Sequence, residues 1–222
     1  MATGLSLVAG EAFPLPSVGP TGEGRSHAPV DDAPPWHGDR VRLSVLPRPE
    51  GATLAELFAA SPRDGGATGF LLAQIDPSRP LLWVQERMAI LEGGRIYPPG
   101  LGLAELIHVE ARDARGALWA MEEGLRCSSL GGVIGELWGD PRALDFTATR
   151  RLAAAAEASG VPAWLVRLGG HTNLSGARMR WHVASLPSAP HAFDHRAPGN
   201  PVWDAKLFRA RGHVPGRWKG NA

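Results

Sequence analysis

The chain has 222 residues, of which 44% are hydrophobic and 20% charged, and its formal net charge is +1. This length suffices for one domain with a substantial core, or for one domain with a tail, so disulfide or metal staples are unnecessary. The single cysteine, Cys127, cannot form a disulfide within the chain and is typical of a reducing compartment. No apolar run approaches the roughly 20 residues that span a bilayer, and residues 1–10 lack the basic start of an export signal. We therefore expect a cytoplasmic protein without a membrane partner.

Charge is distributed unevenly along the chain. From Arg178 onward there are eight basic residues and two acidic ones, a net charge of +6, which leaves −5 for residues 1–177. This asymmetry indicates either a C-terminal surface for nucleic acid or an acidic partner, or else a basic solvated tail.

The predicted elements begin after an N-terminal arm. Residues 1–40 are expected to be poorly ordered, because Pro, Gly, Ser and His are dense between residues 11 and 40 and apolar periodicity is weak. Beyond them, short apolar runs alternate with helical patterns. The predicted strands are Leu54–Phe58, Leu81–Val84, Leu106–Glu110, Gly131–Leu137, Ala163–Leu168, Arg178–Ser185, Lys206–Arg211 and Arg217–Lys219. The predicted helices are Gly69–Ile75, Arg115–Cys127 and Leu144–Ser159, the last entered through Asp140–Pro141 and ended by Gly160.

Apolar runs without polar alternation are typical of strands that helices cover on both faces. We therefore predict an α/β fold in which residues 41–185 form a mostly parallel central sheet flanked by helices. Arg178–Ser185 and the later strands alternate in polarity, which predicts antiparallel edge strands. Residues 186–222 are expected to form a basic C-terminal extension, packed on or extending the sheet, without which residues 41–185 still fold.

The turn after the first predicted strand is where a nucleotide-binding α/β domain carries its phosphate loop, G-x-x-x-x-G-K-[ST]. Ser61–Thr68 retains Gly66 and Thr68 but has Ala67 in place of the lysine, and the only lysines of the chain are Lys206 and Lys219. The degenerate nucleotide-site positions are Gly65, Gly66, Thr68 and Glu136, the last being a carboxylate at a strand end of the kind that holds magnesium. An ordinary helix-capping turn and a solvated acid explain the same residues. We expect neither ATP nor magnesium as a cofactor.

Other chemistry-bearing residues offer weaker patterns. His191 and His195 lie four residues apart without a third ligand, so no metal site is predicted. Cys127 is interpreted as a packed thiol at the end of a helix rather than as a nucleophile.

The segment His171–Trp181 combines a glycine-flanked polar loop with arginines and an aromatic ring, the ingredients of a single-strand binding surface. Its candidate DNA-binding residues are Asn173, Arg178, Arg180 and Trp181. The alternative is that Trp181 belongs to the core. Near the C-terminus, aromatic and arginine side chains of the kind that dominate interfaces predict partner-binding positions, although the aromatics also suit packing on the sheet edge. These positions are Trp203, Leu207, Phe208, Arg209, Arg211 and Trp218.

Several stretches taken together resemble the ImuA family and cover roughly residues 54–218. They are Tyr97–Leu101, Leu118–Cys127, Val133–Glu136, Leu144–Leu152, Ala155–Gly160, Arg178–Val183, and the ending from Pro201–Trp203 to Gly216–Trp218.

The resemblance implies a RecA-like fold and an accessory role in bacterial damage-induced mutagenesis, within the SOS response and DNA repair. The implied partners are an ImuB-like Y-family polymerase homologue, an error-prone replicative-type DNA polymerase, RecA and single-stranded DNA. The loop His171–Ser175 lies where RecA-like proteins place a DNA-contacting loop. Because the lysine is missing, we expect a non-catalytic protein that supports translesion synthesis through protein contacts. Two alternatives are a RecA-like ATPase that retains nucleotide binding and, since relatives are also labelled SulA-like, a cell-division inhibitor.

Overall fold

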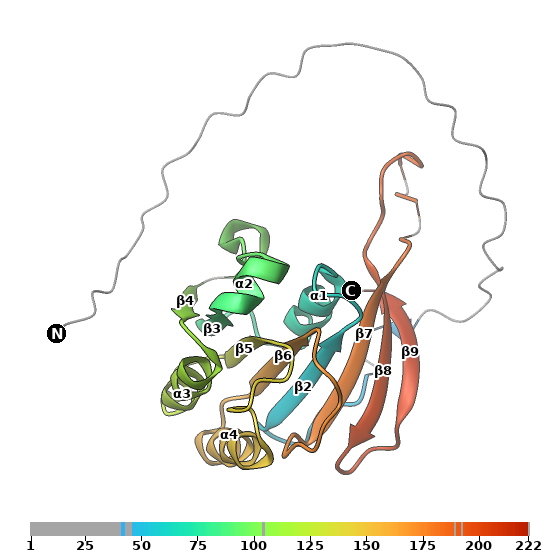
Figure 1. Cartoon of the computed structure of the whole chain (residues 1–222). Coiled ribbons are helices and arrows are strands. Elements are labelled where there is room, and N and C mark those ends of the chain that lie inside the picture. Colours follow the sequence, from blue (N-terminus) through green and yellow to red (C-terminus); the bar gives the residue numbers. More distant parts are fainter. Residues whose placement is uncertain (1–40, 43–45, 104, 189, 192, 222) are drawn as a thin grey trace, which may run out of the picture. The chain divides into compact units, whose positions relative to one another are not determined.

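A single sheet of nine strands organises the chain (Figure 1). The structure is a computed structural model that describes residues 41–42, 46–103, 105–188, 190–191 and 193–221. The strand order is β1-β9-β8-β7-β2-β6-β5-β3-β4. The strands are β1 (Val41–Arg42), β2 (Leu54–Ala59), β3 (Leu81–Glu86), β4 (Leu106–Ala111), β5 (Gly132–Trp138), β6 (Ala163–Leu168), β7 (Met179–Leu186), β8 (Val202–Ala210) and β9 (Gly216–Asn221).

Six strands, β2 to β7, run parallel to their neighbours among themselves, whereas β8 is antiparallel to both β7 and β9. The short β1 pairs in parallel with β9. The predicted α/β class, with a mostly parallel sheet and antiparallel C-terminal strands, is confirmed. The prediction that Arg178–Ser185 forms an edge strand is wrong, because β7 lies between β2 and β8 and pairs in parallel with β2.

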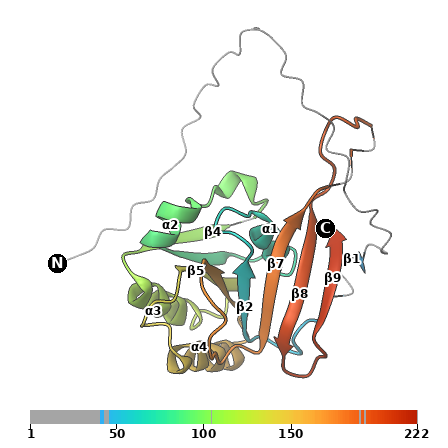
Figure 2. The same cartoon turned by 45° about the vertical axis from the view of Figure 1, so that its right-hand side comes forward.

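The helices cover the sheet from both sides. They are α1 (Gly66–Leu72), α2 (Arg87–Gly93), α3 (Ala114–Gly124) and α4 (Phe146–Ser159). Buried residues of α1 and α2 belong to one apolar cluster, and those of α3 and α4 to a second cluster on the other face (Figures 1 and 2). Every residue of β3 and β6 is buried, as expected for strands with helices on both faces.

Local capping explains where the two longer helices begin. Asp113 caps α3 by accepting the N–H of Gly116, and Asp145 caps α4 by accepting the N–H of Ala148. Helix α4 therefore begins at Phe146, and its N-terminal cap is Asp145 rather than the predicted Asp140–Pro141. Its end at Gly160, with φ of 74° in the left-handed region, is as predicted.

The remaining differences concern shorter segments. Helix α1 begins three residues before the predicted Gly69 and ends at Leu72, and the helix Arg87–Gly93 was not foreseen. Helix α3 ends at Gly124, so Cys127 lies beyond it and is exposed, which corrects its interpretation as a packed thiol.

Residues 186–222 contain β8 and β9, which continue the sheet. The predicted N-terminal arm, residues 1–40, lies outside the described residues. Among the described residues, no helix is both long and apolar enough to cross a membrane.

Candidate functional site

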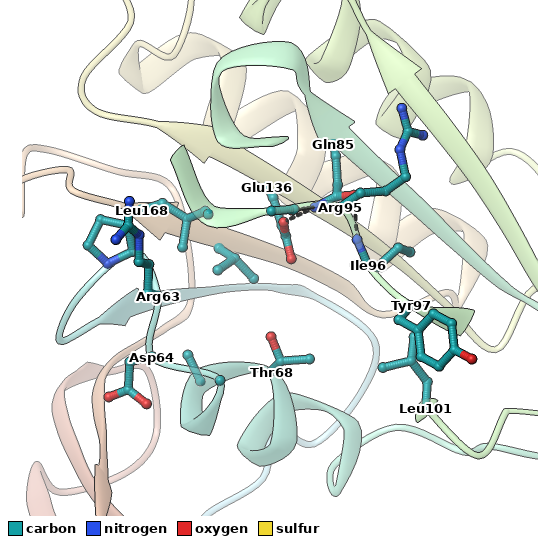
Figure 3. A pocket seen from close by; sticks show the side chains of 16 residues that line it. Arg63, Asp64, Thr68, Gln85, Arg95, Ile96, Tyr97, Leu101, Glu136 and Leu168 are labelled. Carbon is teal, nitrogen blue, oxygen red and sulfur yellow. Dashed lines mark hydrogen bonds between the residues drawn. The ribbon is translucent and has the colours of Figure 1, made fainter. Parts of the chain in front are cut away.

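A cleft of about 250 Å³ opens where the parallel strands β2, β3, β5 and β6 reach their carboxyl ends (Figure 3). Open α/β sheets bind their ligands at this edge. The walls come from the loop after β2, from α1, from the segment that follows α2, and from the ends of the strands. Of the four predicted nucleotide-site residues, Gly65, Thr68 and Glu136 line the cleft. Figure 3 shows the side chains of Thr68 and Glu136 pointing into the same space.

Asp64 lies in the loop after β2 and lines the cleft. Its carboxylate accepts hydrogen bonds from the N–H of Gly66 (2.9 Å) and from the N–H of Ser185 (2.9 Å), and it also accepts the hydroxyl of Ser185. Partial burial opposes ionisation, but the hydrogen bonds from Ser185 and Gly66 outweigh it and hold the pKa of Asp64 below its usual value. The loop therefore binds an anion of its own, which ties it to β7.

Gly66 and Ala67 have structural explanations. A Cβ atom at Gly66 would lie 2.3 Å from the hydroxyl oxygen of Ser185, so the close approach of the loop to β7 requires glycine. Ala67, at the position of the missing lysine, is 2% exposed and packs in the apolar cluster beneath α1. Ala67 also lines the cleft, but its side chain carries no positive charge.

Glu136 lies on β5 and is buried. Its carboxylate accepts a hydrogen bond of 2.6 Å from the side-chain amide of Gln85 on β3. Burial raises the pKa of Glu136, although this hydrogen bond opposes the rise. The same amide donates to the carbonyl of Gly94 (3.1 Å), and the Gln85 carbonyl oxygen accepts the N–H of Ile96 (3.1 Å). Gln85 thus joins Glu136 to the segment after α2, a connection that the sequence does not reveal.

The lining does not suit a magnesium triphosphate. Arg63 and Arg95 are the cations among the described lining residues; both are exposed, and Arg95 is paired with Glu110. The volume is also below the roughly 300–1,000 Å³ of ordinary ligand sites. No group of three or more His, Cys, Asp or Glu side chains that could hold a metal occurs in the described part of the chain.

The predicted DNA-binding residues differ in their exposure to solvent. Trp181 is fully buried, with its ring centroid 5.2 Å from that of Phe70, and Arg180 is 3% exposed. The prediction that these two side chains contact DNA is therefore wrong. Arg178 is partly exposed and paired with Glu157 at 2.7 Å, and Asn173 is exposed.

Arg180 is buried because it belongs to a charged network beneath the segment 169–177. Its guanidinium binds Glu56 at 2.6 Å, and Glu56 also accepts the hydroxyl of Ser175 (2.9 Å). Arg167 lies 3.9 Å from Glu56 and also binds Asp140. As expected from strand alternation, the side chains of Arg180 and Trp181 point to opposite faces of the sheet. The face to which Arg180 points is also covered, by the segment 169–177. The sequence did contain a signal for this buried network, because Glu56 and Arg167 are charged residues within otherwise apolar strands.

Two of the predicted partner-binding residues are also part of the core. Trp203 is 3% and Leu207 0% exposed, because alternate residues of β8 pack toward α1. Their assignment as accessible anchors is wrong. Phe208, on the opposite face, is half-buried with its ring 4.6 Å from that of His182, and Trp218 is partly buried beside Trp181. The exposed members of the predicted set are Arg209 and Arg211.

Comparison with known proteins agrees with the family resemblance. Two curated proteins named Protein ImuA, from two strains of Caulobacter vibrioides, are each 33% identical to this chain over 150 residues, which is 62% of the chain and 58% of each relative. The chain thus spans less than two thirds of the length of these relatives. The expected resemblance to ImuA is confirmed at this level. No protein-family model matches.

Among solved structures, SulA from Pseudomonas aeruginosa is 20% identical, and the match covers 52% of this chain and 98% of that chain with a TM-score of 0.40. A likeness at this level supports no functional argument.

Proposed function

We propose that this chain is a non-catalytic accessory protein of bacterial damage-induced mutagenesis, acting in the cytoplasm and supporting translesion synthesis through contacts with other proteins. The similarity to Protein ImuA supports the biological setting. The partners that this setting implies are an ImuB-like polymerase homologue, an error-prone replicative-type polymerase and RecA.

The proposal that the protein is non-catalytic depends on one observation: the loop after β2 binds a carboxylate of its own, that of Asp64. Asp64 takes the N–H of Gly66, which a phosphate loop would direct at its nucleotide, and Ala67 supplies no positive charge. A triphosphate would have to displace a carboxylate that three hydrogen bonds hold in place, and would meet that negative charge at close range. Both effects oppose nucleotide binding.

The proposal is tested by restoring function to a bacterial strain from which the gene has been deleted. Wild-type chain and the variant Glu136→Gln are each expressed, and the frequency of mutations after DNA damage is measured. If no hydrolysis is involved, we expect both to restore mutagenesis equally, because Glu136 contributes no metal ligand. As a negative control, a strain without either chain shows the uninduced frequency.

Titration with labelled ATP and magnesium separates the remaining alternatives. We expect no saturable binding at micromolar concentrations. Saturable binding together with ATP cleavage, both lost in Glu136→Gln, would establish an ATPase instead. Purification of the chain from damaged cells is expected to recover the polymerase homologue; recovery of the septal tubulin homologue in its place would identify a division inhibitor.

A further inference from the structure

A hollow of about 520 Å³ lies on the α4 side of the sheet, away from the cleft at the strand ends. Its lining includes four arginines, Arg150, Arg178, Arg209 and Arg211. The ring of Phe146 lines it as well and is 40% exposed. This arginine hollow has about twice the volume of the cleft.

Three segments distant in sequence bring the arginines together. Arg150 lies in α4, Arg178 directly precedes β7, and Arg209 is near the end of β8. The N–H of Arg211 donates to the carbonyl of Arg178 (2.8 Å), which sets these two residues side by side. Gly176 lies so close to α4 that a Cβ atom there would be 2.7 Å from the backbone nitrogen of Arg150. Figures 1 and 2 both show the start of β7 and the end of β8 near α4.

The positive charge of the hollow is largely uncompensated. Arg178 is paired with Glu157 at 2.7 Å, and Arg211 acts on the same carboxylate through space, lowering its pKa after the larger effect of the Arg178 hydrogen bond. Arg150, Arg209 and Arg211 form no ion pair within 4.0 Å in the part of the chain that the structure describes. Among the residues that the structure describes, no acidic one lines the hollow. A recess lined by charges of one sign concentrates the potential and attracts anions.

The chemistry of the lining favours phosphodiesters. Guanidinium groups bind phosphate oxygens in a bidentate manner and stay charged at all physiological pH values. The guanidinium carbon of Arg150 lies over the Phe146 ring, 5.8 Å from its centroid, so the cationic group covers one face of the ring, while 40% of Phe146 stays exposed. A basic groove beside an aromatic face is the arrangement with which proteins hold single strands, the phosphates on the cations and a base on the ring. A carboxylate-bearing peptide would use the charges but not the ring.

We propose that the arginine hollow binds single-stranded DNA, with Arg150, Arg209 and Arg211 contacting phosphates and Phe146 stacking on a base. A recess of this volume has the size of an ordinary ligand site, which suits a nucleotide of an extended strand. This site replaces the buried Arg180 and Trp181 with residues from α4 and β8. It goes beyond the proposed function, which needs only protein partners and stands whether or not a strand binds.

The test is fluorescence anisotropy with a labelled oligothymidylate of about 16 nucleotides, the upper end of single-fold site sizes, at several salt concentrations. Three phosphate contacts predict a slope of about −2 in a plot of log K against log salt. The double variant Arg209→Ala with Arg211→Ala should weaken binding roughly twentyfold at about 0.1 M salt and reduce the slope to about −0.7. Phe146→Ala should weaken binding at least about fivefold and leave the slope unchanged.

The matched control is Arg112→Ala with Arg115→Ala, which removes the same charge from exposed positions near α3 and should bind like wild type. Thermal unfolding is measured for each variant, to establish that it is folded. The proposal is overturned if the wild type shows no salt-dependent binding. It is also overturned if the control substitutions weaken binding as much as Arg209→Ala with Arg211→Ala. It also fails if a polyglutamate peptide or free ATP displaces the strand at equal charge concentration.

Discussion

At the scale of single residues, the cleft shows how a carboxylate can lie in a ligand position and still be structural. Glu136 faces the cleft from β5, but its charge is disfavoured by burial and its hydrogen-bond partner, Gln85, is bound to the segment after α2. Asp64 ionises readily but is held by its own loop and Ser185. Both carboxylates therefore have hydrogen-bond partners within the protein.

The raised pKa of Glu136 predicts that Glu136→Gln stabilises the protein at neutral pH. Below the usual value of 4.5 the carboxyl group is protonated in both states and the substitution has little effect. As pH rises through the higher pKa of the folded state, the wild type loses stability, whereas the glutamine does not titrate. We expect a gain of about 1 kcal/mol at pH 7, or roughly 3 °C in Tm.

Thermal unfolding between pH 4 and pH 8 checks this prediction. The control Glu123→Gln, at an exposed position on α3, should change Tm little at any pH. A Glu136→Gln variant that is less stable than wild type at pH 7 would show that the ionised carboxylate is stabilising.

At the scale of elements, two arginines at the start of β7 form ion pairs of different kinds: Arg178 directly precedes the strand and Arg180 lies within it. Arg180 binds Glu56 where both side chains are almost completely buried, whereas Arg178 binds Glu157 where 35% and 41% of the side chains are exposed. Removing one partner of a buried pair leaves a charge without compensation, and this costs far more than losing a surface pair. The face covered by the segment 169–177 should therefore depend on Glu56.

The matched variants Glu56→Gln and Glu157→Gln test this difference. We expect the first to lose about 3–5 kcal/mol of unfolding free energy, because Arg167 and Arg180 then share no buried carboxylate. The second should lose less than about 1 kcal/mol. Urea denaturation measures both; equal losses would mean that the buried network adds no stability beyond that of a surface ion pair.

At the scale of the whole molecule, the C-terminal strands complete the core. Trp203 packs edge-on against Phe70 at 6.4 Å, and Trp218 lies 5.7 Å from Trp181 across the same face. The sequence predicted that residues 41–185 fold without the extension, and these contacts between the two parts give a reason to test that prediction. Without β8 and β9, the hydrogen-bonding edge of β7 would lose its partner strand, and Phe70 and Trp181 would lose the rings of Trp203 and Trp218.

We therefore predict that a chain ending at Pro198 lacks a cooperative thermal transition and binds a hydrophobic dye, as expected for a loosely packed state. As a control, Val214→Asp in the turn between β8 and β9, where the side chain is 84% exposed, should unfold like wild type. A truncated chain that unfolds cooperatively near the wild-type Tm would show that the first strands and helices form an independent domain.

The sequence alone determined the α/β class, most strand positions, the lack of a lysine in the loop after β2, and the resemblance to ImuA. These properties depend on local apolar patterns and on residue identity, which need no partner. Only the tertiary structure decided that β7 is interior and that Arg180, Trp203 and Leu207 are buried. It also decided that Asp64 binds within its own loop, and that Arg150, Arg209 and Arg211 line one hollow. Strand alternation says which residues share a face, but the elements that cover this face come from distant parts of the chain, and long-range pairing places them there.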